Sequence, residues 1–166
     1  MDELGRDELL SAAVRLREQG EPGRARSRLL ELGERYPDDP EVAYQTAWAH
    51  DVLGMEAEAV PFYERCLRGT GLSAEDRRGA LLGLGSTYRV LGRYPEAVAT
   101  LRRGVAEFPD DGALRTFLAM ALYNTGRHEE AMRLTLTLLA TSSEDPGVRR
   151  YRRAIEEYAR DLDATL

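Results

Sequence analysis

The chain has 166 residues, 43% of them hydrophobic, which suffices for one ordinary domain with a continuous core. Its net charge of −6 at pH 7 disfavours nucleic acid and anionic membranes as main partners, because such binders draw most of their affinity from basic surface. All 23 basic residues are arginine, so a phosphate-binding loop that needs a lysine is excluded.

The sequence carries no pattern of export or membrane insertion. Residues 1–8 are acidic and lack the basic start and apolar run of a secretory signal. The longest apolar run, residues 117–123, is far too short to cross a bilayer. Cys66 is the single cysteine, which excludes an intrachain disulfide and fits a reducing compartment. These features predict a cytoplasmic protein with no membrane partner.

Glycine and alanine recur along the chain at a nearly constant spacing. The glycines are 34, 38 and 34 residues apart, at Gly20, Gly54, Gly92 and Gly126. An alanine follows each glycine five places later, at Ala25, Ala59, Ala97 and Ala131. Apolar residues at spacings of three and four lie on both sides of each glycine. Each repeat is therefore predicted to be two amphipathic helices joined by a short turn.

The first two repeats are predicted over residues 6–39 and 40–73. Between them, Asp38 or Asp39 is placed to cap the helix that follows, because a side-chain oxygen there accepts the free backbone N–H groups of the first turn. Pro61 lies five residues into the second helix of the second repeat. Proline removes a backbone donor and clashes with the carbonyl four places back, so this helix is predicted either to kink or to begin late.

The third and fourth repeats are predicted over residues 74–111 and 112–145. Four extra residues, about one helical turn, precede the third repeat, so its first helix is predicted to start a turn early, at about Ala74. A last helix is predicted over about residues 146–163. It is expected to cap the stack by turning one apolar face to the fourth repeat, and this face consists of Val148, Tyr151, Ile155, Tyr158 and Leu162.

The central copy of the repeat, residues 81–109, fits a known family pattern. The matching positions are Leu84, Gly85, Tyr88, Ala97 and Pro109. The chain therefore resembles a tetratricopeptide-repeat protein of the small bacterial type. The resemblance implies an all-α fold in a single domain over residues 1–166. This fold would be a right-handed helix-turn-helix repeat solenoid of four helix pairs with a C-terminal capping helix.

Residues that carry chemistry are few, and each has a structural explanation. The segment 128–130, His-Glu-Glu, begins like a zinc-protease motif, but Met132 stands where the second histidine is needed. His50 is expected to be a hydrogen-bonded residue of the core or of a groove edge. Cys66 is expected to be a small buried residue where helices crowd together. The sequence therefore predicts no catalytic residue, no metal site and no cofactor.

A glycine pattern and an arginine cluster also have structural explanations. Gly79, Gly83 and Gly85 could be mistaken for a dinucleotide loop, but they lie in a helical pattern and follow no strand. Gly83 and Gly85 are therefore assigned to close helix packing. The arginines within residues 149–153 are closely followed by acidic residues, which favours a solvated helix face over nucleic-acid binding.

The family resemblance implies a concave groove lined by the first helix of each pair. The corresponding positions in this chain are Leu10, Val14, Arg17, Tyr44, Trp48, Asp51, Leu82, Ser86, Arg89, Thr116, Met120, Tyr123 and Asn124. Tyr44, Trp48 and Tyr123 are expected to be exposed there, because aromatic residues are enriched at interface hot spots. With Arg89 as its one cation, the groove would suit an apolar peptide anchor flanked by an acidic side chain.

Three function hypotheses remain open from the sequence. The leading one is a non-enzymatic interaction module or scaffold that holds a peptide or a partner's helix in the groove. The competing one is a self-assembling structural subunit, a homo-oligomer whose groove is filled by its own second copy. An enzyme or an RNA-binding helical repeat is a distant third.

Overall fold

A computed structural model describes residues 5–163, which form successive pairs of α-helices. The four pairs are α1 (Arg6–Glu18) with α2 (Pro22–Arg35), α3 (Pro40–Val52) with α4 (Glu56–Arg68), α5 (Ala74–Val90) with α6 (Tyr94–Glu107), and α7 (Gly112–Asn124) with α8 (His128–Ser142). Two shorter helices follow, α9 (Pro146–Arg150) and α10 (Arg152–Arg160). The all-α repeat fold expected from the sequence is confirmed.

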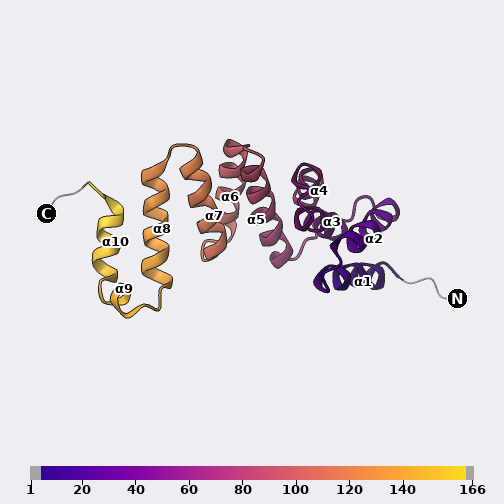
Figure 1. The fold of residues 1–166 in the computed structure, drawn as a ribbon, viewed down its shortest axis with the longest axis horizontal. Coiled ribbons are helices and arrows are strands. Elements are labelled where there is room, and N and C mark those ends of the chain that lie inside the picture. Colours follow the sequence, from indigo (N-terminus) through magenta and orange to yellow (C-terminus); the bar gives the residue numbers. More distant parts are fainter. Residues whose placement is uncertain (1–4, 164–166) are drawn as a thin grey trace.

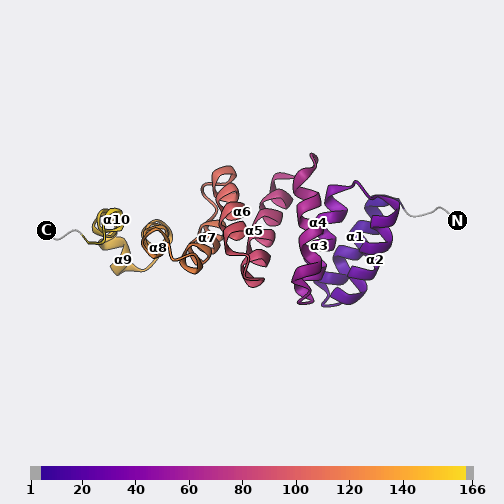
Figure 2. The ribbon, with the colours of Figure 1, turned by 90° about the horizontal axis from the view of Figure 1, so that it is seen from above.

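The helix pairs are stacked in chain order along the long axis of the molecule (Figure 1). The two helices of each pair pack on each other, and the second helix of one pair packs on the first helix of the next. The first helices, α1, α3, α5 and α7, also contact one another in succession. The view from above shows the same order of helices from one end to the other (Figure 2).

Each pair turns at the glycine that marks the repeat. These glycines have positive φ angles of 82°, 70°, 73° and 77°, at Gly20, Gly54, Gly92 and Gly126. In the first turn, the backbone N–H of Glu21 donates to the carbonyl of Leu16 over 2.9 Å. The equivalent bond in the third turn joins Arg93 to Tyr88 over 2.8 Å. Glycine adopts this left-handed conformation without strain, so backbone geometry explains why the glycine recurs.

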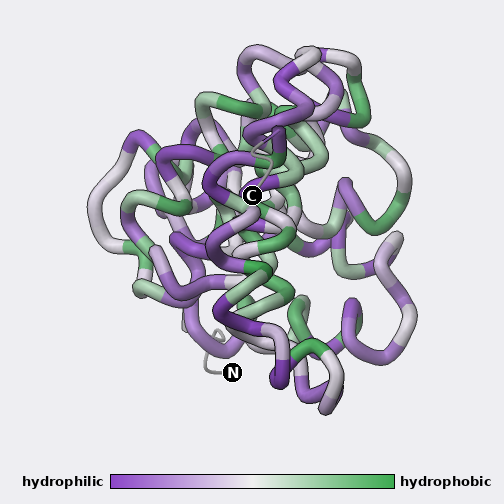
Figure 3. Tube along the Cα trace, turned by 90° about the vertical axis from the view of Figure 1, so that its left-hand side faces the viewer, coloured by the Kyte–Doolittle hydropathy of each residue, from purple (hydrophilic) through white to green (hydrophobic). Residues whose placement is uncertain are grey.

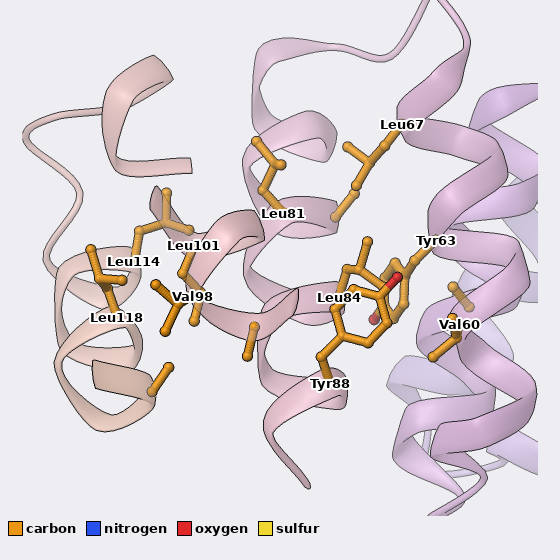
Figure 4. Packing of buried hydrophobic residues seen from close by; sticks show 14 of the residues in the cluster. Val60, Tyr63, Leu67, Leu81, Leu84, Tyr88, Val98, Leu101, Leu114 and Leu118 are labelled. Carbon is orange, nitrogen blue, oxygen red and sulfur yellow. The ribbon is translucent and has the colours of Figure 1, made fainter. Parts of the chain in front are cut away.

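Apolar side chains fill the space between the pairs. The repeated alanines of the first three pairs are completely buried: Ala25, Ala59 and Ala97. The main cluster of buried side chains extends from α3 to α8, and a second cluster around Leu10 and Leu29 joins α1, α2 and α3. Figure 4 shows the middle of the main cluster, where Leu84 of α5 lies next to Tyr63 of α4.

Hydrophobic and hydrophilic residues alternate along individual helices, as the view along the stack shows (Figure 3). This alternation lets each helix turn one face to its neighbours and another to water. Within residues 5–163, no helix combines the length and the apolar character needed to cross a membrane.

Two glycines of α5 lie where neighbouring helices come closest. A Cβ atom on Gly83 would lie 2.9 Å from Cε1 of Tyr63 and closer still to the hydroxyl end of that ring. A Cβ atom on Gly85 would lie 2.7 Å from Cδ2 of Leu101 in α6. Real side chains do not approach this closely, so the assignment of both glycines to close helix packing is confirmed.

Two expected helix starts are confirmed. The first helix of the third pair, α5, begins at Ala74 and has 17 residues, against 13 in α3 and 13 in α7. Asp39 caps α3, because its Oδ1 accepts the backbone N–H groups of Glu41 and Val42 over 2.9 and 3.0 Å. The sequence had left Asp38 and Asp39 as alternatives, and the structure selects Asp39.

Of the two alternatives expected from Pro61, a kink or a late start of α4, the late start is wrong. The helix begins at Glu56, and the backbone N–H of Ala59 donates to the carbonyl of Met55 over 3.0 Å, so the first turn is formed ahead of Pro61. The proline deprives the carbonyl of Ala57 of its helical donor. Both Pro61 and Ala57 are exposed, so water can satisfy that carbonyl and the helix continues through the proline.

The C-terminal helix differs from the expected cap in length and orientation. It is interrupted at Tyr151, and only the second part, α10, packs extensively on α8. The expected apolar face is wrong: Tyr151, Tyr158 and Leu162 are 59%, 46% and 42% exposed. Within the described residues α10 buries one side chain, Ala159, with Ile155 half-buried on the same face.

An arginine explains the orientation of α10. The guanidinium Nε of Arg152 donates to the carbonyl of Ala140 over 2.7 Å, at the end of α8 where backbone carbonyls lack helical partners. This bond fixes the start of α10 against α8. Residues three, four and seven places after Arg152, namely Ile155, Glu156 and Ala159, lie on the same helix face and therefore face α8 instead of the tyrosines.

Candidate functional site

A hollow opens between the first helices of three successive pairs. Its walls come from α3, α5 and α7, and Tyr63 reaches into it from α4. Its volume is about 710 Å³, within the range of roughly 300–1,000 Å³ that is usual for ligand sites. Since α5 contacts both α3 and α7, the stacking of the repeats itself creates this space. It is called the α3–α5–α7 hollow below.

Several residues predicted for the groove line this hollow, namely Tyr44, Trp48, Asp51, Leu82 and Ser86. Trp48 is 40% exposed, as expected. The guanidinium of Arg17 lies over its indole ring, 3.5 Å from the ring centroid, which is a cation–π contact. Arg17 also donates to the side chain of Gln45. The contact leaves part of the ring open to the hollow.

Two predicted groove residues are buried, which corrects the sequence analysis. Tyr44 is only 6% exposed, because its ring packs between Trp48 and Tyr63, with centroid distances of 5.8 and 6.4 Å. Burial raises the pKa of its hydroxyl to about 12. Leu10 is 4% exposed and belongs to the core of α1, α2 and α3, so only its edge, with Val14, lines a separate hollow near the N-terminus.

Asp51 is a half-buried carboxylate held by neutral donors. Its Oδ2 accepts the hydroxyl of Tyr63 over 2.6 Å, and its Oδ1 accepts the hydroxyl of Thr87 over 3.0 Å. Burial raises the pKa of Asp51, while these two hydrogen bonds oppose the shift. Asp51 therefore joins α3, α4 and α5 at the wall of the hollow.

The remaining predicted residues lie in a second hollow between α7 and α8. It has a volume of about 460 Å³ and is lined by Arg89, Thr116, Met120, Tyr123 and Asn124 from the predicted set. Tyr123 is 63% exposed, as expected, and its ring contacts that of His128 at 4.7 Å. Arg89 donates to the side chain of Asn124 over 3.5 Å. The predicted groove is thus divided into separate hollows.

The charge of the main hollow also differs from the expectation. Arg89, expected as its one cation, lies in the second hollow, and the cation that lines the α3–α5–α7 hollow is Arg78. The charged and aromatic lining residues that the sequence analysis missed are Tyr63, Glu75, Asp76, Arg78, Asp111 and Phe117. The four extra residues before α5 were a signal for two of them, because the added turn carries Glu75 and Asp76.

The histidine and cysteine considered from the sequence are both buried. The Nε2 of His50 accepts a hydrogen bond from Arg26 over 3.1 Å, so its Nδ1 carries the proton and donates to the carbonyl of Thr46 over 2.7 Å. Cys66 is 0% exposed, and burial raises the pKa of its thiol to about 12. Its thiol faces the carbonyl of Tyr63 at 3.1 Å. Neither side chain is placed to act on a ligand.

No cluster of three or more histidine, cysteine, aspartate or glutamate side chains suited to a metal ion occurs among residues 5–163. The residues of the α3–α5–α7 hollow are aromatic, apolar and carboxylate, a set that suits contact with a polypeptide.

Solved structures with similar folds are helical-repeat proteins. A fragment titled MamA 41-end from Desulfovibrio magneticus RS-1 is 20% identical, with a TM-score of 0.74 over 93% of this chain and 89% of that one. YrrB, whose title describes a TPR protein with an unusual peptide-binding site, is 19% identical, with a TM-score of 0.65 over 93% of this chain and 84% of that one. At these identities the likeness concerns the fold.

Comparison by sequence assigns the family. Among curated proteins the comparison finds no match. The family model described as Tetratrico peptide repeat matches residues 40–162, which is most of the chain. This match covers the second, third and fourth helix pairs together with α9 and α10. The glycine turns and the stacked helix pairs described above agree with that assignment, and the chain belongs to the tetratricopeptide-repeat family.

Proposed function

We propose that this protein is a non-enzymatic interaction module that holds a segment of a partner protein in the α3–α5–α7 hollow. The observation that carries the proposal is the partly exposed indole of Trp48 on the wall of a hollow built by three successive repeats. A large aromatic surface of this kind anchors a partner's apolar side chain at little entropic cost. The buried thiol of Cys66, which fits a reducing compartment, supports a cytoplasmic location for this function.

Trp48 makes the proposal directly testable, because it is the only tryptophan in the chain. Peptides would be selected on the protein from a random library, and their binding measured by the change in tryptophan emission. Leu82→Ala, which removes an apolar wall of the hollow, is expected to weaken binding about tenfold or more. The matched control is Leu91→Ala, at the exposed turn after α5, which should bind as the unmodified protein does.

The selection can also contradict the proposal. Selected peptides that bind both variants equally and leave the emission of Trp48 unchanged would place the binding surface elsewhere. Melting curves of both variants exclude unfolding as the cause of a lost signal.

Self-assembly is a second candidate function, which the C-terminal end of the stack favours. Met132 and Leu139 of α8 are 49% and 43% exposed, and Tyr158 and Leu162 are similarly open. A second copy that covers these side chains would remove apolar surface from water. Light scattering after size-exclusion chromatography tests this candidate, since a mass of one chain at every concentration eliminates it.

A further inference from the structure

The charges that line the α3–α5–α7 hollow are mostly negative. Four carboxylates are present, from Asp51, Glu75, Asp76 and Asp111, against the single guanidinium of Arg78. This guanidinium already forms an ion pair within the protein, because its Nε lies 3.5 Å from Oδ2 of Asp111. The other three carboxylates therefore determine the charge that a ligand meets in the hollow.

These three carboxylates lack cationic partners. None of the ion pairs formed within residues 5–163 includes Asp51, Glu75 or Asp76. Asp51 is the most enclosed, and its two partners, Tyr63 and Thr87, are neutral hydroxyls. A carboxylate withdrawn from water without an opposite charge is held at an energetic cost, which a cation from a ligand would offset.

The aromatic wall of the hollow also favours a cation. The ring of Trp48 already attracts one guanidinium, that of Arg17, to a centroid distance of 3.5 Å. Tyr44 packs on the same indole and lies close enough to Glu75 and Asp76 for their charges to raise the pKa of its hydroxyl, after the larger effect of burial. Aromatic faces and carboxylates therefore meet on one side of the hollow, as in sites that bind cationic side chains.

Apolar contacts are available beside the charges. Leu82 of α5 and Phe117 of α7 line the same hollow and are both half-buried. Two of the unpaired carboxylates, Glu75 and Asp76, come from the extra turn by which α5 exceeds α3 and α7, and this turn lies at one end of the helix. The position of α5 between α3 and α7 can be followed in Figure 1. The one break in the repeat period has thus added an acidic rim to an apolar hollow.

We propose that the partner segment is basic: an arginine or lysine side chain enters beside Asp51, Glu75 and Asp76, and a neighbouring apolar side chain packs on Leu82 and Phe117. This inference rests on the proposed function and adds the chemistry of the partner. It reverses the expectation from the sequence, which had placed a cation in the groove and an acidic residue on the ligand.

Matched synthetic peptides test the charge of the partner. Three peptides share one apolar sequence, and their charged positions are all arginine, all glutamine or all glutamate. Titration followed by Trp48 emission at low salt should give the tightest binding for the arginine peptide, about tenfold or more over the glutamine peptide. The advantage should shrink as salt is added, because partly exposed charges are screened.

Variants locate the charge effect in the hollow. Glu75→Gln combined with Asp76→Asn should remove most of the advantage of the arginine peptide. The matched control, Glu58→Gln combined with Glu129→Gln, changes the net charge equally at exposed positions outside the hollow and should keep the advantage. Arg78→Gln should strengthen binding of the arginine peptide, a gain that misfolding cannot produce.

Any outcome other than those expected contradicts the inference, and each such outcome points to a different cause. Equal affinities for the arginine and glutamine peptides, with changed Trp48 emission, leave the proposed function intact and refute a basic partner. Tighter binding of the glutamate peptide does the same. An advantage lost equally in the control variant shows attraction to the acidic protein as a whole. Absence of any response to all three peptides refutes the inference, and the library selection then decides on the hollow itself.

Discussion

The interface between α4 and α5 and the interface between α8 and α10 show two ways of joining helices in one stack. Between α4 and α5, large side chains interlock: Tyr63 is 2% exposed and Leu81 is 0% exposed. Between α8 and α10, the buried side chains are alanines, while Leu139 is 43% exposed. The central helices have a pair on each side, whereas α8 has only the short α10 on its outer side. The interface flanked by full pairs on both sides therefore buries larger side chains than the interface that the short α10 covers.

The largest expected contrast comes from shortening a leucine in each region. Leu101→Ala should lower the free energy of unfolding by about 2–5 kcal/mol, because Leu101 is completely buried and its removal leaves a cavity. Leu139→Ala, at a half-open position of α8, should change it by no more than about 1 kcal/mol. Urea unfolding of both variants measures the two changes. Equal losses of unfolding free energy would mean that the C-terminal region is packed as tightly as the centre.

Filling the closest contact of the central interface should have the next largest effect. Gly83→Ala places a Cβ against the ring of Tyr63, and the displacement of that ring should cost about 1–3 kcal/mol. The matched control is Gly33→Ala in α2, where the nearest atom, Cγ1 of Val42, is 4.0 Å from the new Cβ. That variant should gain up to about 1 kcal/mol from helix propensity. A melting temperature that falls for Gly83→Ala and rises for Gly33→Ala would support the contrast. Equal changes in melting temperature would contradict it.

Removing a polar link between the first two pairs should lower the free energy of unfolding by a smaller amount, and this amount should depend on pH. Asp39 caps α3 and accepts two hydrogen bonds from the guanidinium of Arg6 in α1, over 2.7 and 2.8 Å. Burial alone would raise the pKa of Asp39, but the bonds from Arg6 and from the backbone outweigh it and leave the pKa lowered. Asp39→Ala should cost about 0.5–2 kcal/mol at pH 7.

The sign of the pH dependence follows from that lowered pKa. The contribution of Asp39 is fully present above its unfolded value of 3.8 and is lost as the pH falls through the folded value. The stability difference between the unmodified protein and Asp39→Ala should therefore shrink below pH 4, as urea unfolding at several pH values would measure. Asp38→Ala, at an exposed neighbour, serves as control. A difference that stays constant with pH would assign the effect to something other than the carboxylate.

The smallest free energies of local opening are expected at α10. Its amides should exchange with solvent faster than those of α5, because α10 buries only Ala159 among the described residues and has few apolar contacts to hold it. Hydrogen exchange measured by mass spectrometry compares the two helices in one sample. Equal protection would show that the exposed tyrosines of the C-terminal end are covered in solution, for example by a second copy.

The repeat register could be predicted from the sequence because single residue types determine it. Gly92 has a positive φ that favours glycine, and Ala97 is completely buried. The early start of α5 followed from the residue count together with the helix-start pattern at residues 73–76. These features are local, and local geometry is what a sequence pattern records best.

The faces of the helices were harder to predict, because they depend on neighbours. Helix α3 contacts α1, α2, α4 and α5, so residues on nearly all its sides are buried, and Tyr44 is enclosed although it shares a face with the exposed Trp48. The orientation of α10 depends on the bond from Arg152 to the end of α8, a contact between two elements. The acidic hollow combines residues of three repeats, and no spacing within one repeat reveals it.

The stacking order has a consequence for how such a chain changes in evolution. Extensive contacts join each helix only to its own pair and to adjacent pairs. A gene duplication of one whole repeat would therefore lengthen the protein while leaving the contacts of distant pairs unchanged. A shift of four residues, as before α5, instead alters the wall of a single hollow. Length and the lining of a hollow can thus evolve separately: whole repeats set the reach of the molecule, and a single added turn changes the residues that line one hollow.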